Sequence, residues 1–205
     1  MHSKLTLIRR DEGKEKLVDY CVIGTGNYHE GTAKVYTDYH LMTNDKRIAK
    51  EARKVFQFIE SPYKHYAFKH LLVSPNTTRS GLEALIDREI VNARAGKKAE
   101  FWVKINSISD HGMINKLYEA SDAGVQIRMV VRGICCLDMA HPKARNISSV
   151  SIVGRFLEHT RAFCFHNDGN PQYYISSADW MGRNLNRRVE VTVPIYDESI
   201  QRQLR

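Results

Sequence analysis

The sequence predicts a mixed α/β protein in which helices flank a mixed sheet, and three observations predict it. Apolar runs of strand length alternate with amphipathic stretches along the 205 residues. A pattern near the amino terminus returns in the same order near the carboxyl terminus. Apolar residues make up 42% of the chain, which is enough for a substantial core. We therefore expect the last part of one structural repeat followed by most of a second.

The first segment should form a hairpin, a third strand and a helix. Residues 5–9 and 17–23 are rich in Val, Ile, Leu and Tyr around a polar loop that contains glycine, which is typical of a hairpin. Residues 35–43 predict the third strand. Asn and Asp at positions 44 and 45 can cap a helix over residues 46–59, whose apolar residues lie on one stripe.

The rest of the chain should alternate strands with helices. We place a boundary near residues 61–66 and divide the chain into domains 1–63 and 64–205. Glycines at 96 and 124 should end two of the helices. The predicted strands cover residues 68–73, 101–105, 125–131, 150–153, 162–165, 173–176 and 189–195, and the predicted helices cover residues 77–95, 111–123 and 197–205.

An internal repeat brings the same kinds of polar side chain back in the same order. Residues 23–28 match residues 175–180 without a gap, because residue 24 aligns with residue 176 at an offset of 152. Both strings have small residues, then an amide or acid, then an aromatic residue. The polar positions that match at this offset are Asn27 with Asp179 and Asp38 with Glu190. A turn role for Asn27 and Asp179 remains an alternative to ligand contact.

A histidine and a cation precede each copy of this string. His2 stands two positions before Lys4, and His159 stands two positions before Arg161. Because side chains alternate along a strand, each cation should lie on the same face as its histidine. The seven other histidines lack this duplicated context, and we assign them no chemistry.

Such a duplicated set can build one phosphoryl-transfer site at a pseudo-twofold axis. One imidazole can attack phosphorus and the other can protonate the leaving oxygen, while the cations hold the non-bridging oxygens. Asp38 and Glu190 lie in apolar runs, where an unpaired carboxylate is costly, so each needs a partner.

We expect each carboxylate to orient the histidine of its own half. Asp38 should then accept a hydrogen bond from His2, and Glu190 should accept one from His159. Both imidazoles should face one shared pocket, which would be lined by Lys4, Arg161, Asn27 and Asp179.

The arrangement resembles the phospholipase D superfamily, whose signature is His-x-Lys-x4-Asp followed by Gly-Ser-x-Asn. This chain departs from the signature at two positions. Arg9 stands where the aspartate would be, and Arg161 replaces the second lysine. Both departures add positive charge, which suits a more highly charged phosphate substrate than a simple diester.

Longer strings narrow the resemblance to the C-terminal part of the bacterial polyphosphate kinases, over essentially the whole chain. The family's chains are several times longer, so upstream residues that help to bind metal and phosphate would be absent and the isolated piece could be inactive. The strings that carry this resemblance are residues 2–4, 24–29, 36–38, 132–137, 151–159 and 177–181 with Arg183 and Asn184.

The resemblance implies reversible transfer of the terminal phosphate of ATP to inorganic polyphosphate, through a phosphohistidine and with release of ADP. It implies that His2 is the nucleophile and that His159 is the general acid and base, an order that sequence symmetry cannot decide. Tyr36 and Arg132 are then expected to contact ATP, as is His159. The resemblance also implies Mg²⁺ with the nucleotide and a homo-oligomeric full-length protein.

Composition favours an anionic partner. Lysine and arginine number 31 against 23 acidic residues, for a formal net charge of +8. Nucleic acid would satisfy this charge, but the usual basic and aromatic nucleic-acid motifs are missing, so we expect no such partner. The four cysteines lack metal-ligand spacing and should be reduced thiols. Without an apolar run of about 18 residues, we expect a cytoplasmic protein that could also associate peripherally with a membrane.

Two other classes of function remain open. A phosphodiesterase or nuclease of the phospholipase D type would use the same histidines, although Arg9, Tyr36 and the string around Arg132 argue against it. The other alternative is a non-catalytic domain that binds anions.

Overall fold

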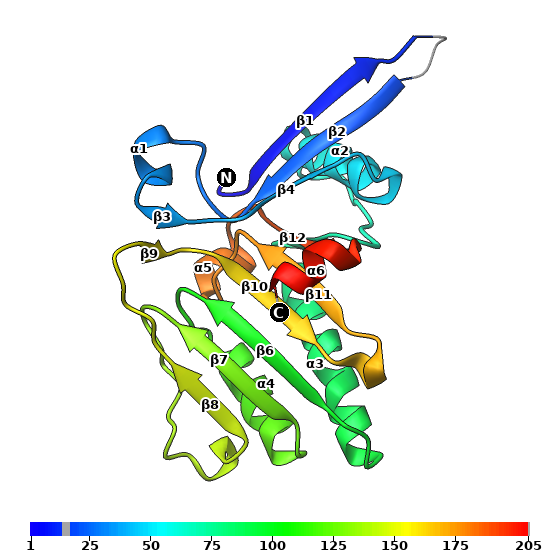
Figure 1. Ribbon diagram of the computed structural model, residues 1–205. Coiled ribbons are helices and arrows are strands. Elements are labelled where there is room, and N and C mark those ends of the chain that lie inside the picture. Colours follow the sequence, from blue (N-terminus) through cyan, green and yellow to red (C-terminus); the bar gives the residue numbers. More distant parts are fainter. Residues whose placement is uncertain (14–16, 205) are drawn as a thin grey trace.

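The computed structural model describes residues 1–13 and 17–204, and its described residues form sheets of three, seven and two strands flanked by helices (Figure 1). This arrangement confirms the mixed α/β class. Residues 14–16 of the predicted hairpin loop and Arg205 of the predicted last helix lie outside the described residues. In the described part of the chain, no helix is long and apolar enough to cross a membrane.

The three-stranded sheet carries the predicted hairpin. Strands β1 (Lys4–Asp11), β2 (Leu17–Gly24) and β4 (His40–Thr43) pair antiparallel in the order β1-β2-β4. Figure 1 shows the far end of the hairpin projecting from the body, with helix α2 (Lys46–Glu60) against the sheet. The side chain of Asp45 caps α2 by accepting from the Arg47 N–H at 2.8 Å.

The predicted third strand over residues 35–43 is divided in two. A short helix α1 (Glu30–Ala33) precedes strand β3 (Tyr36–Thr37), and only β4 joins the hairpin. Strand β3 pairs in parallel with β9 (Leu157–Glu158), which lies about 120 residues later. Local pattern cannot reveal a partner so distant in sequence.

The large sheet combines parallel and antiparallel pairs. Strands β6 (Glu100–Ile105), β7 (Gln126–Val131) and β8 (Ile147–Val150) are parallel, and the remaining neighbours are antiparallel. In spatial order the strands are β5 (Leu72–Ser74), β12 (Glu190–Ile195), β11 (Gln172–Ser176), β10 (Arg161–Phe165), β6, β7 and β8.

Helices α3 (Thr78–Arg94) and α4 (His111–Asp122) cover one face of this sheet (Figure 1). Both match their predicted positions, and the glycines that follow them have φ values of 72° and 99°. Helix α6 (Glu198–Leu204) begins as predicted. Helix α5 (Gly182–Asn186) was not among the predicted elements, and neither were the short 3₁₀ turns Pro142–Ala144 and Asn167–Gly169.

Two predicted strands are displaced. In the predicted strand 68–73, three successive backbone N–H groups donate to the carboxylate of Glu51 at 2.7 to 2.9 Å, so only Leu72–Ser74 is a strand. The predicted strand 150–153 is instead Ile147–Val150, because pairing with β7 begins at Ile147. Val153 is 90% exposed.

Candidate active site

His159 is oriented by Asp38. Nδ1 of His159 lies 2.8 Å from Oδ1 of Asp38, which also accepts from the Thr25 hydroxyl at 2.7 Å. Because a carboxylate can only accept, Nδ1 carries the hydrogen and Nε2 keeps its lone pair. The His159 side chain is 13% exposed and that of Asp38 is 12% exposed, so this pair is largely shielded from water.

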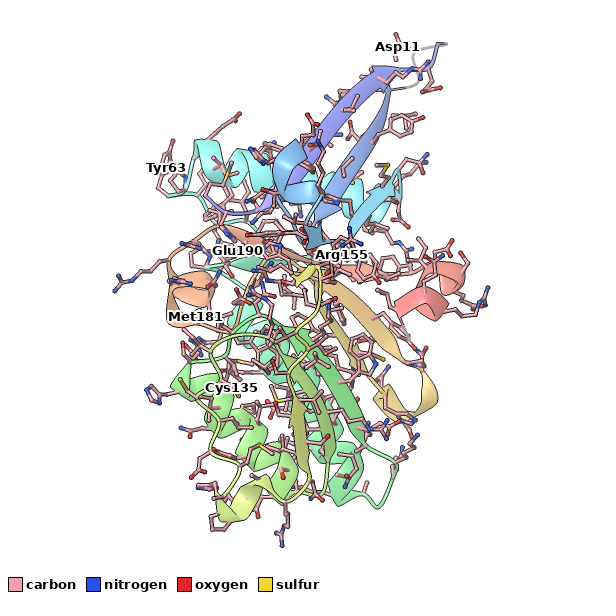
Figure 2. The ribbon with its side chains drawn as sticks, turned by 60° about the vertical axis from the view of Figure 1, so that its left-hand side comes forward. Asp11, Tyr63, Cys135, Arg155, Met181 and Glu190 are labelled. Atoms are coloured by element: carbon pink, nitrogen blue, oxygen red, sulfur yellow. The ribbon has the colours of Figure 1, made fainter. Side chains whose placement is uncertain are left out.

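His2 is oriented by Glu190 in the same manner. Nδ1 of His2 lies 2.8 and 2.9 Å from the two carboxylate oxygens of Glu190, which is fully buried. The Ser177 hydroxyl donates to Oε2 at 2.5 Å and the Asn184 amide donates to Oε1 at 2.7 Å. Figure 2 shows Glu190 where the N-terminal sheet meets the large sheet.

The predicted pairing within each half is wrong, because the pairs are crossed. Asp38 of the first half orients His159 of the second, and Glu190 of the second half orients His2 of the first. Each imidazole therefore has its orientation only when both halves are packed together.

Backbone contacts explain the crossing. The N–H of His159 donates to the carbonyl of Thr37 at 3.3 Å, and the N–H of His2 donates to the carbonyl of Val189 at 3.1 Å. Each histidine thus lies beside the residue that directly precedes the carboxylate of the other half. Thr37 and Val189 match at the offset of 152.

The repeat extends to other hydrogen bonds. The Thr25 N–H donates to the Tyr39 carbonyl and its hydroxyl accepts from the Tyr39 N–H, at 2.9 and 3.1 Å. Ser177 and Val191 form the equivalent two bonds, both at 3.1 Å. Two half-sites with the same contacts therefore face each other across the junction.

Each imidazole has a buried cation beside it. Lys4 is 6% exposed, and its Nζ lies 3.2 Å from both ring nitrogens of His2. Arg161 is 3% exposed, and its Nη1 lies 3.1 Å from Nε2 of His159. The same Nη1 donates to the Thr25 carbonyl at 3.2 Å, which ties the second half to the first.

The two half-sites are close enough to act on each other electrostatically. Burial lowers the pKa of Lys4 to about 8, with Glu190 opposing this shift and Arg161 adding to it. Asp38 of the first half and Arg188 of the second also act on Lys4, raising and lowering its pKa respectively. Lys4 therefore lies within the field of both carboxylates and of the second cation.

Asp38 remains ionised despite its burial. Burial alone raises the pKa of Asp38, but hydrogen bonds from His159 and Thr25 and the charges of His159 and Arg161 together lower it below its usual value. An ionised Asp38 keeps the hydrogen of His159 on Nδ1.

Asp179 holds Arg161 in place. It pairs with Arg161 at 3.0 Å and accepts from the backbone N–H groups of Asn106 and Ser107 at 3.0 and 3.1 Å. With its amide turned so that both ends are satisfied, Asn106 donates to the Glu158 carbonyl and accepts from Arg161 at 2.7 Å. Direct contact of Asp179 with phosphate stays a prediction.

The positions expected to contact nucleotide differ in their surroundings. The ring of Tyr36 is tilted beside that of His159, with 5.1 Å between centroids. Arg132 is half-buried, and its buried Nε has no hydrogen-bond partner among the described residues. Asn27 is exposed in the turn, where its carbonyl accepts from the His29 N–H.

Arg9 does not add charge to this site. Its Nε pairs with Asp19 at 3.1 Å on the neighbouring strand of the hairpin. Arg9 is five positions after Lys4 on the same strand, which corresponds to roughly 16 Å. Figure 2 shows Asp11, two residues further along the same strand, at the tip of the hairpin away from Glu190. The expectation that both departures add positive charge at the histidines is therefore wrong, because Arg161 replaces one cation with another and Arg9 pairs with Asp19 elsewhere.

Four polar residues of the site were missed by sequence reasoning. Thr25 and Ser177 matched within the repeated string, and that match could have identified them as donors to the carboxylates that also recur. Asn184 lies in a family string but outside the repeat signal, and Asn106 has no sequence signal. The described residues contain no group of three or more His, Cys, Asp or Glu that could hold a metal ion.

Comparisons with known proteins point to one family. A family model described as polyphosphate kinase C-terminal domain 2 matches residues 71–205, and one described as polyphosphate kinase C-terminal domain 1 matches residues 1–65. The polyphosphate kinase of Vibrio cholerae is 51% identical over 100% of this chain and 29% of its own length. That of Escherichia coli is 45% identical over 100% of this chain and 30% of its own length.

A solved structure agrees with the sequence comparisons. The crystal structure of polyphosphate kinase from Porphyromonas gingivalis has a TM-score of 0.91 and 38% identity, over 99% of this chain and 32% of that chain. The chain thus spans about three tenths of the length of its relatives, in the region that the two C-terminal family models describe. By these matches, the chain belongs to the polyphosphate kinase family.

Proposed function

We propose that the protein containing this chain transfers the terminal phosphate of ATP reversibly to inorganic polyphosphate through a phosphohistidine on His2. The observation that carries this proposal is the crossed pair of carboxylate-bound imidazoles, each with a buried cation beside it. Because the carboxylates hold the hydrogen on Nδ1, Nε2 of each ring is the nitrogen available for chemistry.

In the first step, Nε2 of His2 attacks the γ-phosphorus of ATP. A nitrogen–phosphorus bond forms and the bond from phosphorus to the β–γ bridging oxygen breaks, so ADP leaves. His159, protonated on Nε2 at this point, gives its proton to the leaving oxygen. Lys4 and Arg161 neutralise the charge on the non-bridging oxygens.

In the second step, the terminal oxygen of polyphosphate attacks the phosphorus of phosphohistidine. His159 takes back a proton, from the attacking oxygen when that oxygen is protonated and otherwise from solvent, and the nitrogen–phosphorus bond breaks. The donor and acceptor oxygens occupy the same place in turn, so one general acid and base serves both steps. Nη1 of Arg161 contacts Nε2 of His159 at 3.1 Å, and a bound phosphate would compete for this donor.

We assign nucleotide contacts to Tyr36, Arg132 and His159, and phosphate contacts to Lys4, Arg161, Asn27 and Asp179. The half-buried Arg132, whose Nε lacks a partner in the described chain, suits an anionic ligand. The described residues do not fit a protein-held Mg²⁺, because Asp38, Asp179 and Glu190 are already bound to histidine or arginine. We propose that Mg²⁺ arrives with ATP, and we assign it no step.

The remaining assignments concern the whole protein. We propose domains 1–63 and 64–205, which the crossed and repeated contacts support as two related halves. We further propose a cytoplasmic homo-oligomer that uses ATP, ADP and polyphosphate and does not bind nucleic acid.

The test uses the full-length protein with radioactive γ-labelled ATP and, separately, with bis-nitrophenyl phosphate. We expect label on the protein, passage of that label to added polyphosphate, and no hydrolysis of the diester. Diester hydrolysis without labelling by ATP would replace the proposal with a phospholipase D-type phosphodiesterase. Binding of polyphosphate without either reaction would indicate a non-catalytic anion-binding protein.

A further inference from the structure

We infer that Asn184 is a positioning residue that fixes Glu190 and, through it, the His2 imidazole. This inference rests on the proposed function. The Nδ2 of Asn184 donates to Oε1 of Glu190 at 2.7 Å, and the two residues are 1% and 0% exposed. Asn184 acts on the histidine only through the carboxylate.

Hydrogen-bond donors on both oxygens hold the Glu190 carboxylate in one orientation. Ser177 occupies Oε2 at 2.5 Å and Asn184 occupies Oε1 at 2.7 Å, while Nδ1 of His2 lies within 2.9 Å of both oxygens. A fully buried carboxylate cannot replace a lost donor with bulk water, so losing Asn184 would leave an unsatisfied acceptor and a freer carboxylate. The direction of the Nε2 lone pair depends on that carboxylate.

Asn184 breaks the symmetry of the site. At the sequence offset of 152, Asn184 in α5 aligns with Thr32 in α1. The Thr32 hydroxyl, however, contacts His29 at 3.0 Å. Asp38 accepts from Thr25 and His159, and the equivalent of Asn184 is directed elsewhere. The additional donor therefore supports the histidine that we propose as nucleophile, which must keep one orientation through both half-reactions.

The local fold keeps Asn184 at this position. Its backbone N–H donates to the Met181 carbonyl at 2.9 Å, and the next residue, Leu185, is completely buried. Glu190 is the first residue of β12 and lies six positions after Asn184, so one short connection brings donor and acceptor together. Because a carboxylate only accepts, the amide must present its nitrogen to Glu190.

The test measures single-turnover labelling of the full-length enzyme by ATP. Asn184→Leu keeps a similar volume without the donor, and we expect labelling about ten- to a hundredfold slower with the KM for ATP unchanged. Asn184→Asp puts a second carboxylate against Glu190. We expect a larger loss at pH 8 and partial recovery at pH 6, because a proton shared by the two carboxylates restores a donor.

Two matched controls separate positioning from general damage. Asn186→Ala removes an exposed amide two residues along the same helix, which contacts Arg79, and should label at the wild-type rate. Thr32→Ala changes the symmetry-related position and should also have no effect. Circular dichroism establishes that each variant is folded.

The outcomes are distinguishable from failure of the proposed function. An unlabelled wild type would overturn the proposed function and this inference together. A labelled wild type with Asn184→Leu at the same rate would overturn the inference alone. If Asn184→Leu does not fold, the pH comparison of Asn184→Asp decides, and a loss that is equal at pH 6 and pH 8 would overturn the positioning role.

Discussion

His159 and Asp38 are 121 residues apart in sequence, yet Nδ1 of the imidazole lies 2.8 Å from Oδ1 of the carboxylate. The reciprocal pair, His2 with Glu190, spans 188 residues. Each half of the repeat therefore supplies the carboxylate that the other half needs. Neither half alone holds an oriented imidazole, so the two halves must pack together to orient both rings.

The crossed pairing predicts the coupling between substitutions. Once His159→Ala has removed the imidazole, Asp38→Asn should slow labelling little further, because Asp38 no longer has a histidine to orient. Glu190→Gln should still slow labelling in that background, because it acts on His2. A double-mutant cycle on single-turnover labelling rates checks this. Strong coupling of His159 to Glu190, with none to Asp38, would contradict the crossed pairing and would support pairing within each half.

His2→Ala should abolish both labelling by ATP and turnover in the full-length enzyme. Phosphohistidine is labile in acid and stable in base, so the wild-type label should show that behaviour. His29→Ala is the matched control, because this exposed histidine caps α1 and has no place in the proposed mechanism. Acid-stable label, or label that survives in His2→Ala, would remove His2 as the nucleophile.

His159→Ala should slow turnover by about 10²- to 10⁴-fold, the usual contribution of general acid–base catalysis. The global stability should change little, because the histidine contacts polar groups at a junction and is not part of the apolar core. Steady-state rates and thermal unfolding measure the two effects. A variant that unfolds, or one that loses no rate, would make His159 structural.

The sequence predicted the elements whose causes are local. Helices α2, α3 and α4 match their predicted ranges because their start and stop signals are local. Aspartate side chains cap α2 and α4, and a glycine with positive φ follows α3 and α4. The predicted strand 68–73 failed because a distant carboxylate, that of Glu51, takes its backbone hydrogens.

For the candidate site, the repeat identified which residue types recur but not which copies meet. Two equivalent histidines and two equivalent carboxylates can pair within or between halves, and the pattern is the same in both cases. The choice depends on the His2 and His159 backbones lying beside Val189 and Thr37, a tertiary contact. Asn184 could not be predicted because its counterpart in the repeat, Thr32, has a different partner.

Arg132→Ala should raise the KM for ATP by roughly ten- to a hundredfold, the range expected for losing one charged hydrogen bond. Its Nε is buried and has no protein partner in the described chain, and an anion bound at this arginine would satisfy that donor. The matched control is Arg145→Ala, because Arg145 is exposed and pairs with Asp122. An unchanged KM for ATP in Arg132→Ala would show that Arg132 does not contribute to nucleotide binding.

We expect Lys4 to make polyphosphate binding depend on pH. Its pKa is lowered to about 8, first by burial, so its charge is present below pH 8 and is lost as the pH rises through that value. The affinity for polyphosphate should therefore fall between pH 7 and pH 9. Lys4→Arg keeps its charge throughout this range and should show a smaller fall. Equal losses of affinity in the two proteins would assign the pH dependence to another group.

The lowered pKa of Lys4 should have the opposite effect on the stability of the protein. Affinity for polyphosphate should fall as the pH rises, whereas the contribution of Lys4 to stability should rise. The unfolded chain holds the Lys4 proton up to about pH 10.5, whereas the folded protein releases it near pH 8. Between these values the unfolded state binds more protons, so the contribution of Lys4 to stability rises with pH. Lys4→Met should thus be more stable than wild type at pH 7, and this advantage should shrink above pH 8. Chemical denaturation at pH 7 and pH 9 measures the difference, with exposed Lys34→Met as control. A stability advantage of Lys4→Met that grows with pH would contradict burial as the cause of the lowered pKa of Lys4.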